Sequence, residues 1–586
     1  MLILNMFLCL FLMFFFFKTP TLALSDFTIN ENIEYLLNLS GQATVTHQID
    51  ITNNFSQIYP KEYQIQIQGL PLSDLNATDD GGNILTNFLS QNDSSQIKLK
   101  FNQPKVGKNQ TTTFKLIYRV PELAKHKGKT WEISLPQLTD SALNNTQITL
   151  KTPSDFGTLS FASVPVKFQE GLNQNTVSLQ NNSHSKILII LGNYQLFDFK
   201  LNYSLKNNTS STITSEIAII PDTYSQSVYY QSISPSPLGI RVDPDGNWLA
   251  SYELKSGEEL NIIADGQVKT GLHLPVETTN LEKYLSDQTF WPVSDPQIQD
   301  ISRNLNSSRA IYNYVVDTLN YNYDRLNSSG RLGALAAIND PNNSLCTEFT
   351  DLFVTLARAK NIPAREIEGF AYSNNPKIKP ISLQNDVLHA WPEYYDSTSK
   401  TWKAVDPTWE KTTNGIDYFS DLDLNHITFV THGLDSQNPL PPGSYRNEFS
   451  EKSIAISFAT EEIKTVTALP LIAFKNDRLL LQNYTPNSQK NLLLSSTNLS
   501  LNQTIDYILP YSSKEITIPK MSFWKSLSSR HQKITFTLKN TEEQVSVQTI
   551  NYPPHFINLG ISIIIGLIIL TTSGIIITSL THEKNT

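Results

Sequence analysis

Two long apolar segments, one near each end of the 586-residue chain, constrain its topology more than any other feature. The first covers residues 1–17 and is followed by Lys18 and by the small-residue stretch Thr21-Leu22-Ala23. An apolar run of this length with a small-residue exit predicts a secretory signal peptide over residues 1–24. No Lys or Arg precedes the run, so an uncleaved N-terminal anchor is the alternative interpretation.

The second apolar segment, residues 557–580, carries no charged residue and is long enough to cross the ~30 Å hydrocarbon layer. A buried core helix is the alternative, which the length of the segment disfavours. A signal peptide followed by a late stop-transfer segment predicts a single-pass type I protein of the cell membrane. Its ectodomain would be extracellular, its transmembrane helix would span 557–580, and its cytoplasmic tail would be 581–586.

The net charge and the cysteine content further limit the class of protein to which the chain can belong. The net charge is −9 and is spread without blocks, which argues against a nucleic-acid partner. The chain has two cysteines, and Cys9 lies inside the predicted signal peptide, so Cys346 alone remains and no internal disulfide can form. An exported chain of this length must therefore be held together by hydrophobic cores, divided among several domains.

Hydrophobic periodicity predicts the domain order. Period-two alternation, interrupted by turn-rich breaks, predicts two β-sandwich-like domains at 25–155 and 156–275. Helical periodicity appears within 276–435, a Pro-rich linker follows at 436–450, and alternation returns in a C-terminal β domain at 451–550. The expected fold class is multidomain, with an α+β domain flanked by all-β sandwich-like domains and a C-terminal transmembrane helix.

Cys346 stands at the start of a predicted helix that ends at Asn361-Ile362-Pro363. Apolar residues recur behind it on one stripe: Phe349, Leu352, Phe353, Leu356 and Ala357. Ser344 is the expected N-cap, which places Cys346 in the first turn. Free backbone N–H groups and the positive dipole end favour a thiolate there and can bind an oxyanion. The alternative role for a lone cysteine is that of a small buried apolar residue.

Of the ten histidines, His389 has the context most typical of a catalytic base. Two strand-like runs flank the turn residues 396–399 and predict a hairpin closed by Tyr395 and Lys400. In that register His389 lies directly opposite Asp406, with Cβ atoms ~5 Å apart. A cysteine nucleophile, a histidine base and an orienting aspartate form a complete set for acyl transfer. An isolated His–Asp pair, by contrast, is more often structural.

Four stretches together resemble the transglutaminase-like superfamily in their order and spacing. They are LCTEF around Cys346, NIPAR at 361–365, LHAWPEYY around His389 and WKAVDPTW around Asp406. The resemblance covers residues 285–435 and does not extend to the flanking β domains.

The resemblance implies a papain-like α+β core, in which the helix that carries the cysteine packs on an antiparallel sheet that carries the histidine and the aspartate. It implies Cys346 as nucleophile, His389 as base and Asp406 as orienter. Two positions depart from the family pattern without removing a catalytic atom. Ser344 stands where members often have Gly, and Pro392 stands where they often have an aliphatic residue.

The expected function is that of a cell-surface transglutaminase-like enzyme, either a cysteine acyltransferase or an amidase/protease. Its triad would move an acyl group from an amide or peptide carbonyl into a thioester, which an amine resolves to a crosslink or water to a hydrolysis product. The expected partners are a protein or peptide substrate and the membrane, through the C-terminal helix. The alternative is a non-catalytic, membrane-anchored surface scaffold or adhesion protein whose transglutaminase-like domain only binds.

No cofactor or metal is expected, since the chain has neither a Cys/His ligand cluster nor an EF-hand loop. Three aspartates could suggest calcium but are expected to be solvated loop charges: Asp351, Asp421 and Asp423.

Four tryptophans have weaker candidate roles. Trp391, Trp402 and Trp409 either line an acyl-donor tunnel or pack in the core, and aromatic burial favours the core. Trp291 is either an oxyanion donor through its indole N–H or part of a turn at the entry to the α+β domain.

Overall fold

The computed structural model describes residues 26–68, 70–91, 94–136, 143–181, 187–273, 280–327, 330–373, 388–445, 453–463, 468–475, 478–496, 499, 501–518, 532–552 and 568. Among these residues no helix is both long enough and apolar enough to span a membrane. The predicted signal peptide, the predicted tail and, apart from Ile568, the predicted transmembrane helix lie outside the described residues.

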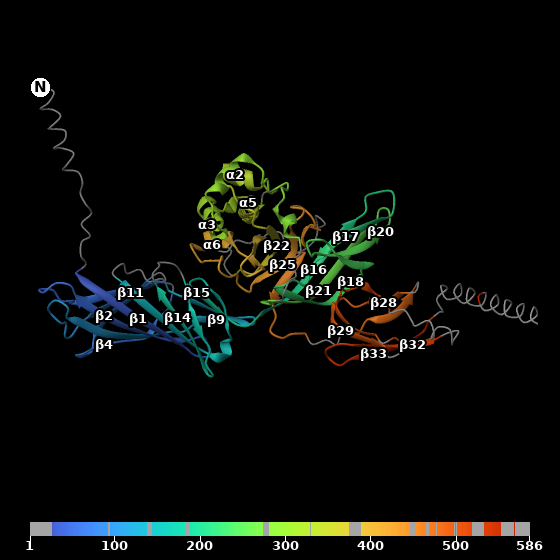
Figure 1. The fold of residues 1–586 in the computed structure, drawn as a ribbon. Helices are drawn as coiled ribbons and strands as arrows, with labels where there is room; N and C mark the ends of the chain where they lie inside the picture. The colour runs from blue at the N-terminus through green and yellow to red at the C-terminus, as the bar shows by residue number, and fades with distance from the viewer. Residues whose placement is uncertain are drawn as a thin grey trace, which may run out of the picture.

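The described chain is mostly β, and its named helices, apart from one short 3-10 turn at 154–156, lie between residues 281 and 413. The N-terminal β domain lies at one end of the molecule and the C-terminal β domain at the other, with the helices above the region between them (Figure 1). This multidomain, mostly β architecture is the one that the periodicity predicts.

The N-terminal β domain is a single unit that extends well beyond residue 155. Its strands form sheets in the orders β13-β14-β11-β1-β2-β8-β4-β5, β3-β7-β6 and β12-β15-β10-β9. They are β1 Phe27–Leu37, β2 Ala43–Asn53, β3 Glu62–Gln68, β4 Ser73–Asp79, β5 Gly82–Asn83, β6 Leu85–Gln91, β7 Ser94–Lys100, β8 Thr111–Val120, β9 Ala124–Lys127, β10 Thr130–Leu135, β11 Leu143–Pro153, β12 Leu159–Ala162, β13 Lys167–Gln169, β14 Gln174–Asn181 and β15 Ile187–Leu191.

The expected division at residue 155 falls at a short 3-10 turn, η1 Ser154–Phe156, inside this domain. Strand β11, just before the turn, pairs in parallel with β1 and antiparallel with β14, just after it. One hydrophobic core accordingly runs from Ile29 to Leu191. The turn residues near 155 resemble a domain boundary in the sequence. The long-range pairing of β1 with β11, however, keeps the strands on both sides of this turn in one domain.

The second β domain packs two sheets, β18-β21-β16-β26 and β17-β20-β19. Its strands are β16 Gln195–Lys206, β17 Ile213–Ile219, β18 Gln226–Ser234, β19 Gly239–Val242, β20 Trp248–Leu254, β21 Glu259–Thr270 and β26 Ile454–Phe458. Strand β26 comes from the region expected to belong to the C-terminal domain, and it pairs with β16 in the register Phe197↔Phe458. The second domain is therefore built from two distant parts of the chain.

The C-terminal β domain has its own core and two sheets, β27-β28-β31 and β30-β29-β32-β33. Its strands are β27 Leu471–Lys475, β28 Arg478–Asn483, β29 Gln489–Ser496, β30 Leu501–Ile508, β31 Ser512–Ile516, β32 Gln532–Lys539 and β33 Val545–Tyr552.

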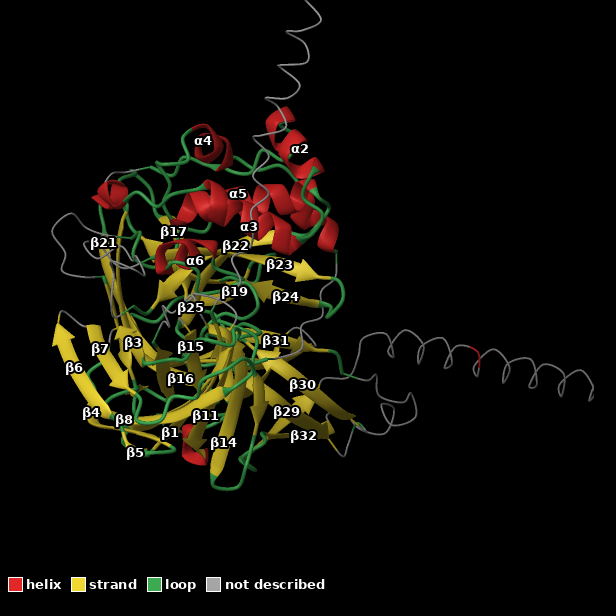
Figure 2. Ribbon diagram, turned by 90° about the vertical axis from the view of Figure 1, so that its left-hand side faces the viewer, coloured by secondary structure: helices red, strands yellow, loops and turns green. Residues whose placement is uncertain are grey.

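The α+β domain has an antiparallel sheet of order β24-β23-β22-β25, formed by β22 Ala364–Ala371, β23 His389–Asp396, β24 Thr401–Ala404 and β25 His426–His432. Its helices are η2 Leu281–Leu285, α2 Pro296–Arg303, α3 Ser308–Thr318, η3 Tyr323–Asn327, α4 Ala334–Asn339, α5 Cys346–Ala359 and α6 Pro407–Thr413. Helix α5 lies over this sheet (Figure 2), and its apolar stripe shares a core with Tyr394 of β23. This packing fixes the start of α5 relative to the strands.

Candidate active site

Cys346 is the first residue of α5 and is partly exposed. The N-cap is Leu345, not the expected Ser344. Ser344 is fully buried and forms a β-bridge with Tyr321, while the Leu345 N–H donates to Glu348 Oε2 at 2.8 Å. Glu348 thus accepts from the N-cap N–H, as the N3 residue of a capping box does, and Ser344 is not the cap. The first N–H groups of α5 have no acceptor within the helix, as at any helix start.

The Glu348 carboxylate is buried close to the cysteine, and neighbouring groups compensate its charge. Its Oε1 accepts from the Leu332 N–H at 2.7 Å, and its Oε2 lies 3.2 Å from an Arg325 guanidinium nitrogen. A buried carboxylate that is paired and hydrogen-bonded costs far less than an isolated one. The arrangement keeps a negative charge in the first turn of α5 without leaving it free to oppose a thiolate.

His389 and Asp406 are in direct contact. His389 opens β23, and its Nε2 lies 2.9 Å from Asp406 Oδ2, with both side chains completely buried. Asp406 follows β24 and is the N-cap of α6, where its Oδ1 accepts from the Trp409 N–H at 3.0 Å. The two oxygens of Asp406 therefore have separate partners, and the helix cap fixes the orientation of the carboxylate toward the imidazole.

The predicted hairpin register is wrong, although the two residues meet. The observed pairs are Asp396↔Thr401 and Glu393↔Ala404, so the turn lies one residue later than expected at each end. Asp396 accepts from the Thr398 N–H at 3.0 Å, and Lys400 has a left-handed φ of 55°, so Lys400 belongs to the turn and cannot close the ladder.

His389 therefore has no partner across the hairpin, since β24 ends at Ala404. Asp406 contacts His389 from the turn that starts α6, where Asp406 is the helix N-cap. The two residues are therefore not a cross-strand pair.

The protonation of this pair follows from burial and charge. Burial alone would lower the pKa of His389, but the charge and hydrogen bond of Asp406, with a smaller contribution from Cys346, raise it to about 9. Burial would raise the pKa of Asp406, but His389 and then His426 lower it to about 2. His389 Nδ1 is buried and has no hydrogen-bond partner among the described residues. Below a pH of about 9 the site therefore holds an imidazolium beside a carboxylate, and Nδ1 of this imidazolium carries a proton that it can donate.

Aromatic rings enclose the histidine. Trp409 stacks on His389 with ring centroids 5.1 Å apart, and Trp391 stacks with centroids 5.9 Å apart. Trp391 and Trp402 also line a cleft of about 920 Å³, whose described lining includes neither Cys346 nor His389. All three tryptophans are buried. The contacts support core packing over a tunnel that leads to the thiol, with Trp391 and Trp409 around the imidazole and Trp402 against Tyr284 and Tyr395.

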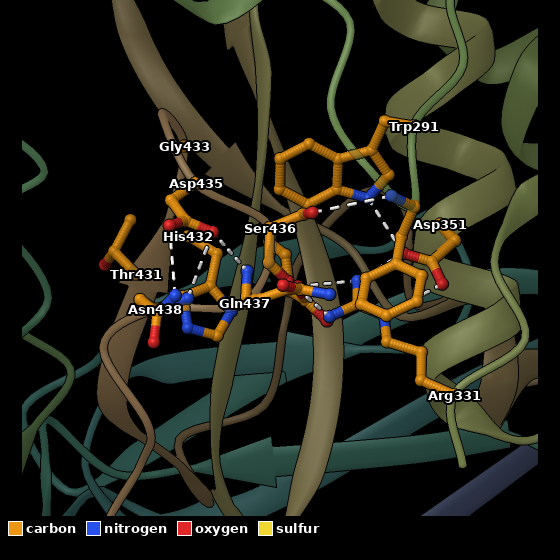
Figure 3. Close-up of polar contacts among 12 residues, drawn as sticks. Trp291, Arg331, Asp351, Thr431, His432, Gly433, Asp435, Ser436, Gln437 and Asn438 are labelled. Carbon is orange, nitrogen blue, oxygen red and sulfur yellow. Dashed lines mark hydrogen bonds and ion pairs between the residues drawn. The ribbon is translucent and has the colours of Figure 1, made fainter.

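The structure contradicts the oxyanion role of Trp291 and the loop position of Asp351, and it places Trp291 in a turn at the domain entry, which was the alternative considered for it. Figure 3 shows the Trp291 indole directed at Asp351, with Nε1 donating to Oδ1 at 2.8 Å. Asp351 lies inside α5, is fully buried and also pairs with Arg331. The indole N–H is thus occupied and is not an oxyanion donor, and Asp351 is not a solvated loop charge. Of the other two aspartates, Asp421 is exposed and Asp423 is buried against His426.

His426 is the residue near the triad that sequence reasoning missed. It opens β25, its Nδ1 lies 2.8 Å from Asp423 Oδ1, and its Nε2 lies 3.6 Å from Asp406 Oδ2. No motif marks it, because β25 reaches the site only by pairing with β22. Period-two alternation in HITFVTH could have located the strand but not its neighbour.

Two groups of described side chains have donor atoms near enough to one another to hold a metal ion, namely His389, Asp406 and His426, and Glu366, Glu368 and His432. In the first group, His389 Nε2 lies 2.9 Å and His426 Nε2 lies 3.6 Å from Asp406 Oδ2. In the second, Glu366 pairs with both Arg331 and His432. Both groups thus belong to existing networks of hydrogen bonds and ion pairs.

A helix-start cysteine near a buried histidine–aspartate pair, on an α+β core with an antiparallel sheet, is the arrangement of nucleophile, base and orienter that the sequence predicts. Residues 293–407 match the family model described as the transglutaminase-like superfamily, and the matched range contains Cys346, His389 and Asp406. The chain therefore carries a transglutaminase-like core domain, as the resemblance predicts.

Comparison with curated proteins gives no significant match. Among solved structures, a protein from Cytophaga hutchinsonii proposed to be a cysteine protease is similar, with 16% identity, a TM-score of 0.33, and coverage of 47% of this chain and 93% of that one. The periplasmic domain of TgpA from Pseudomonas aeruginosa is similar with 14% identity, a TM-score of 0.20, and coverage of 38% of this chain and 91% of that one. An M1 zinc metallopeptidase from Deinococcus radiodurans has 12% identity, a TM-score of 0.20, and coverage of 31% and 45%.

Proposed function

We propose that this protein is a cell-surface transglutaminase-like enzyme that transfers acyl groups from amide or peptide carbonyls through a thioester on Cys346. The observation that carries the proposal is the buried 2.9 Å contact between His389 and Asp406, beside a partly exposed cysteine at a helix start. Cys346 is the nucleophile, His389 the acid and base, and Asp406 the orienter.

The reaction follows from the positions of these groups. The Cys346 thiolate attacks the carbonyl carbon, a C–S bond forms, and the carbonyl electron pair moves to oxygen, where N–H groups of the first turn of α5 can donate. Collapse of this intermediate breaks the C–N bond, and the His389 imidazolium gives its proton to the leaving amine. Neutral His389 then takes a proton from the incoming amine or water, whose attack on the thioester releases the thiolate.

The acceptor decides the product. An amine acceptor gives an isopeptide crosslink, and water gives a carboxylate, so one triad serves an acyltransferase and a hydrolase alike. The two are separated by a direct experiment on the full-length chain with a glutamine-containing peptide, with and without a primary amine. Mass spectrometry would follow the acyl-enzyme, the amine adduct and the hydrolysed peptide, and ammonia release would give the rate.

The proposal expects an acyl-enzyme at Cys346, loss of turnover in Cys346→Ala, and turnover that persists in a chelator. Leu172→Ala is the control, because Leu172 is 99% exposed in the N-terminal domain. Turnover in Cys346→Ala would overturn the nucleophile assignment. If no acyl-enzyme forms with any amide or peptide donor, the chain is instead a surface scaffold whose core domain only binds.

The cell-surface location belongs to the same proposal and rests on segments 1–24 and 557–580. A chain truncated after Tyr552 keeps every described strand through β33. It is expected to leave the membrane fraction, whereas the full-length chain remains there after an alkaline wash. A truncated chain that still sediments with membranes would place the anchor at the N-terminal segment.

A further inference from the structure

A second carboxylate–imidazole pair lies directly behind the triad. His426 Nδ1 is 2.8 Å from Asp423 Oδ1, and its other nitrogen, Nε2, is buried and faces Asp406 Oδ2 at 3.6 Å. This Nε2 forms no hydrogen bond with the described residues. Two imidazoles therefore approach the same oxygen of Asp406, with His389 at 2.9 Å and His426 at 3.6 Å.

Carboxylates and imidazoles alternate in one chain of neighbours, Asp423, His426, Asp406 and His389. Burial lowers the pKa of His426, but Asp423 and Asp406 raise it above its ordinary value. Two aromatic rings enclose His426, Trp409 with centroids 4.7 Å apart and Trp391 with centroids 5.0 Å apart. With little water between them, the charges act on one another strongly.

We propose that the Asp423–His426 pair positions Asp406 and sets how firmly Asp406 holds His389. His426 is then a positioning residue that acts through Asp406, and it touches neither the thiol nor the substrate. The proposal rests on the proposed function in one respect, that Asp406 is the orienter of the triad.

The second pair also connects the triad to the cleft of about 920 Å³. Asp423 and His426 both line this cleft, together with strand β12 of the N-terminal domain and residues that follow β21. Since Asp423 lines the cleft and contacts His426 Nδ1, a proton can reach His426 from the cleft through Asp423, and the described lining includes neither Cys346 nor His389. Protonation of His426 then weakens the attraction between the Asp406 carboxylate and His389, because both imidazoles approach the same carboxylate oxygen.

The protonation of His426 depends on a small number of neighbouring groups. The ionisable groups that act on His426 are Asp423, on the segment before β25, and Asp406, the cap of α6, with the ring of His389 of β23 at 5.9 Å. Cys346 of α5 acts on His389 and also on Tyr321. A substitution of His426 removes a positive charge that competes with His389 for one carboxylate oxygen.

The test compares the full-length wild type with His426→Gln, His426→Leu and Asp423→Asn. His426→Gln keeps an N–H donor but loses the charge, so its kcat should fall less than that of His426→Leu, which should fall about tenfold with KM little changed. In both His426 variants, the alkaline limb of the pH–kcat profile should move to higher pH, because His389 keeps its proton longer. Asp423→Asn should give a smaller shift, since it weakens the charged form of His426 without removing the imidazole. His273→Gln is the matched control: it lines the same cleft, is exposed, and should leave both quantities unchanged.

A purely structural His426 would lower the melting temperature and leave the alkaline limb in place, and that result overturns the proposal. A second readout does not need turnover: NMR titration of histidine labelled with ¹³C, with His389 assigned through His389→Gln. His426→Gln should raise the midpoint of His389, and an unchanged midpoint would also overturn the proposal. If no substrate is found but the midpoint rises, the proposed reaction fails and the positioning role stands.

Discussion

The indole N–H of Trp291 donates a 2.8 Å hydrogen bond to Oδ1 of Asp351, and both side chains are fully buried. The bond ties the entry segment of the α+β domain to α5, the helix that starts with Cys346. Arg331 pairs with the same carboxylate and also with Glu366 of β22. The helix is thus held to the sheet by buried polar contacts as well as by its apolar stripe.

Trp291→Phe is therefore expected to lower the free energy of unfolding by about 1–3 kcal/mol, since it leaves a buried carboxylate oxygen one donor short. The kcat of the folded protein should stay within twofold of wild type, roughly 0.4 kcal/mol in the barrier. Urea unfolding and steady-state kinetics measure the two quantities. A large fall in kcat with unchanged stability would return the indole to an oxyanion-binding role.

Asp406→Asn is expected to keep the fold and lose activity. Asn is as good an N-cap as Asp, so its Oδ1 can still accept from the Trp409 N–H. Its amide, however, presents N–H to His389 Nε2 and reverses the required tautomer, which costs on the order of 10⁴ in kcat in triads of this type. Asp406→Ala serves as the comparison, because it should lose a further ~1 kcal/mol of stability with the cap. Wild-type kcat in Asp406→Asn would exclude the orienter role.

Stability should fall as the pH rises from about 6.5 to about 9. Against the effect of burial, carboxylates raise the pKa of both His389 and His432 to about 9, so the folded state binds more protons than the unfolded chain in this interval. Each histidine contributes on the order of 3 kcal/mol below the interval, and this is lost above it. Urea unfolding across the range measures the slope. His432→Gln should reduce the slope, and a slope of zero in the wild type would contradict the assignment.

The hairpin turn offers a test of backbone strain. Lys400 has a left-handed φ of 55°, which costs a non-glycine residue roughly 1–2 kcal/mol. Lys400→Gly should therefore stabilise the protein by up to about 1 kcal/mol, and Lys400→Val should destabilise it. Lys403→Gly, in β24, is the matched control and should destabilise by roughly 0.5–1 kcal/mol. Thermal unfolding distinguishes these outcomes, and a Lys400→Gly that unfolds earlier than wild type would show that the turn needs its lysine.

The positions of the three triad residues were predictable from the sequence, but the structure around them was not. Cys346, His389 and Asp406 stand in local patterns, a helix start and a strand–turn–strand, that short-range rules can read. The register within that hairpin was not predictable by the same rules, because the turn that Asp396 initiates and the left-handed Lys400 moved the closing pair by one residue. His389 and Asp406 meet through a helix cap that the register argument did not consider.

What sequence reasoning missed depends on long-range pairing. His426 joins the site because β25 pairs with β22, some sixty residues away in the chain. The N-terminal domain continues past residue 155 because β11 returns beside β1. Burial of Asp351 in α5 likewise follows from Trp291 and Arg331, which approach from elsewhere. Periodicity identifies the elements, but no local pattern identifies their neighbours.

Strand β26 supplies the last prediction. It pairs with β16 at the edge of the second domain, where the Asn202 N–H donates to Ser453 O and the Ala459 N–H to Leu196 O. Alternation along an antiparallel ladder makes Ala455 and Lys200, which are paired, a hydrogen-bonded pair as well. Ala455→Pro removes that N–H and should lower the free energy of unfolding by about 1–3 kcal/mol.

Ala455→Ser, which keeps the N–H at an exposed position, is the matched control and should stay within about 0.5 kcal/mol of wild type. Urea unfolding of the full-length chain measures both variants. Equal stability of the proline and serine variants would mean that β26 adds little to the second domain, and that residues 454–458 act only as a connection to the C-terminal domain.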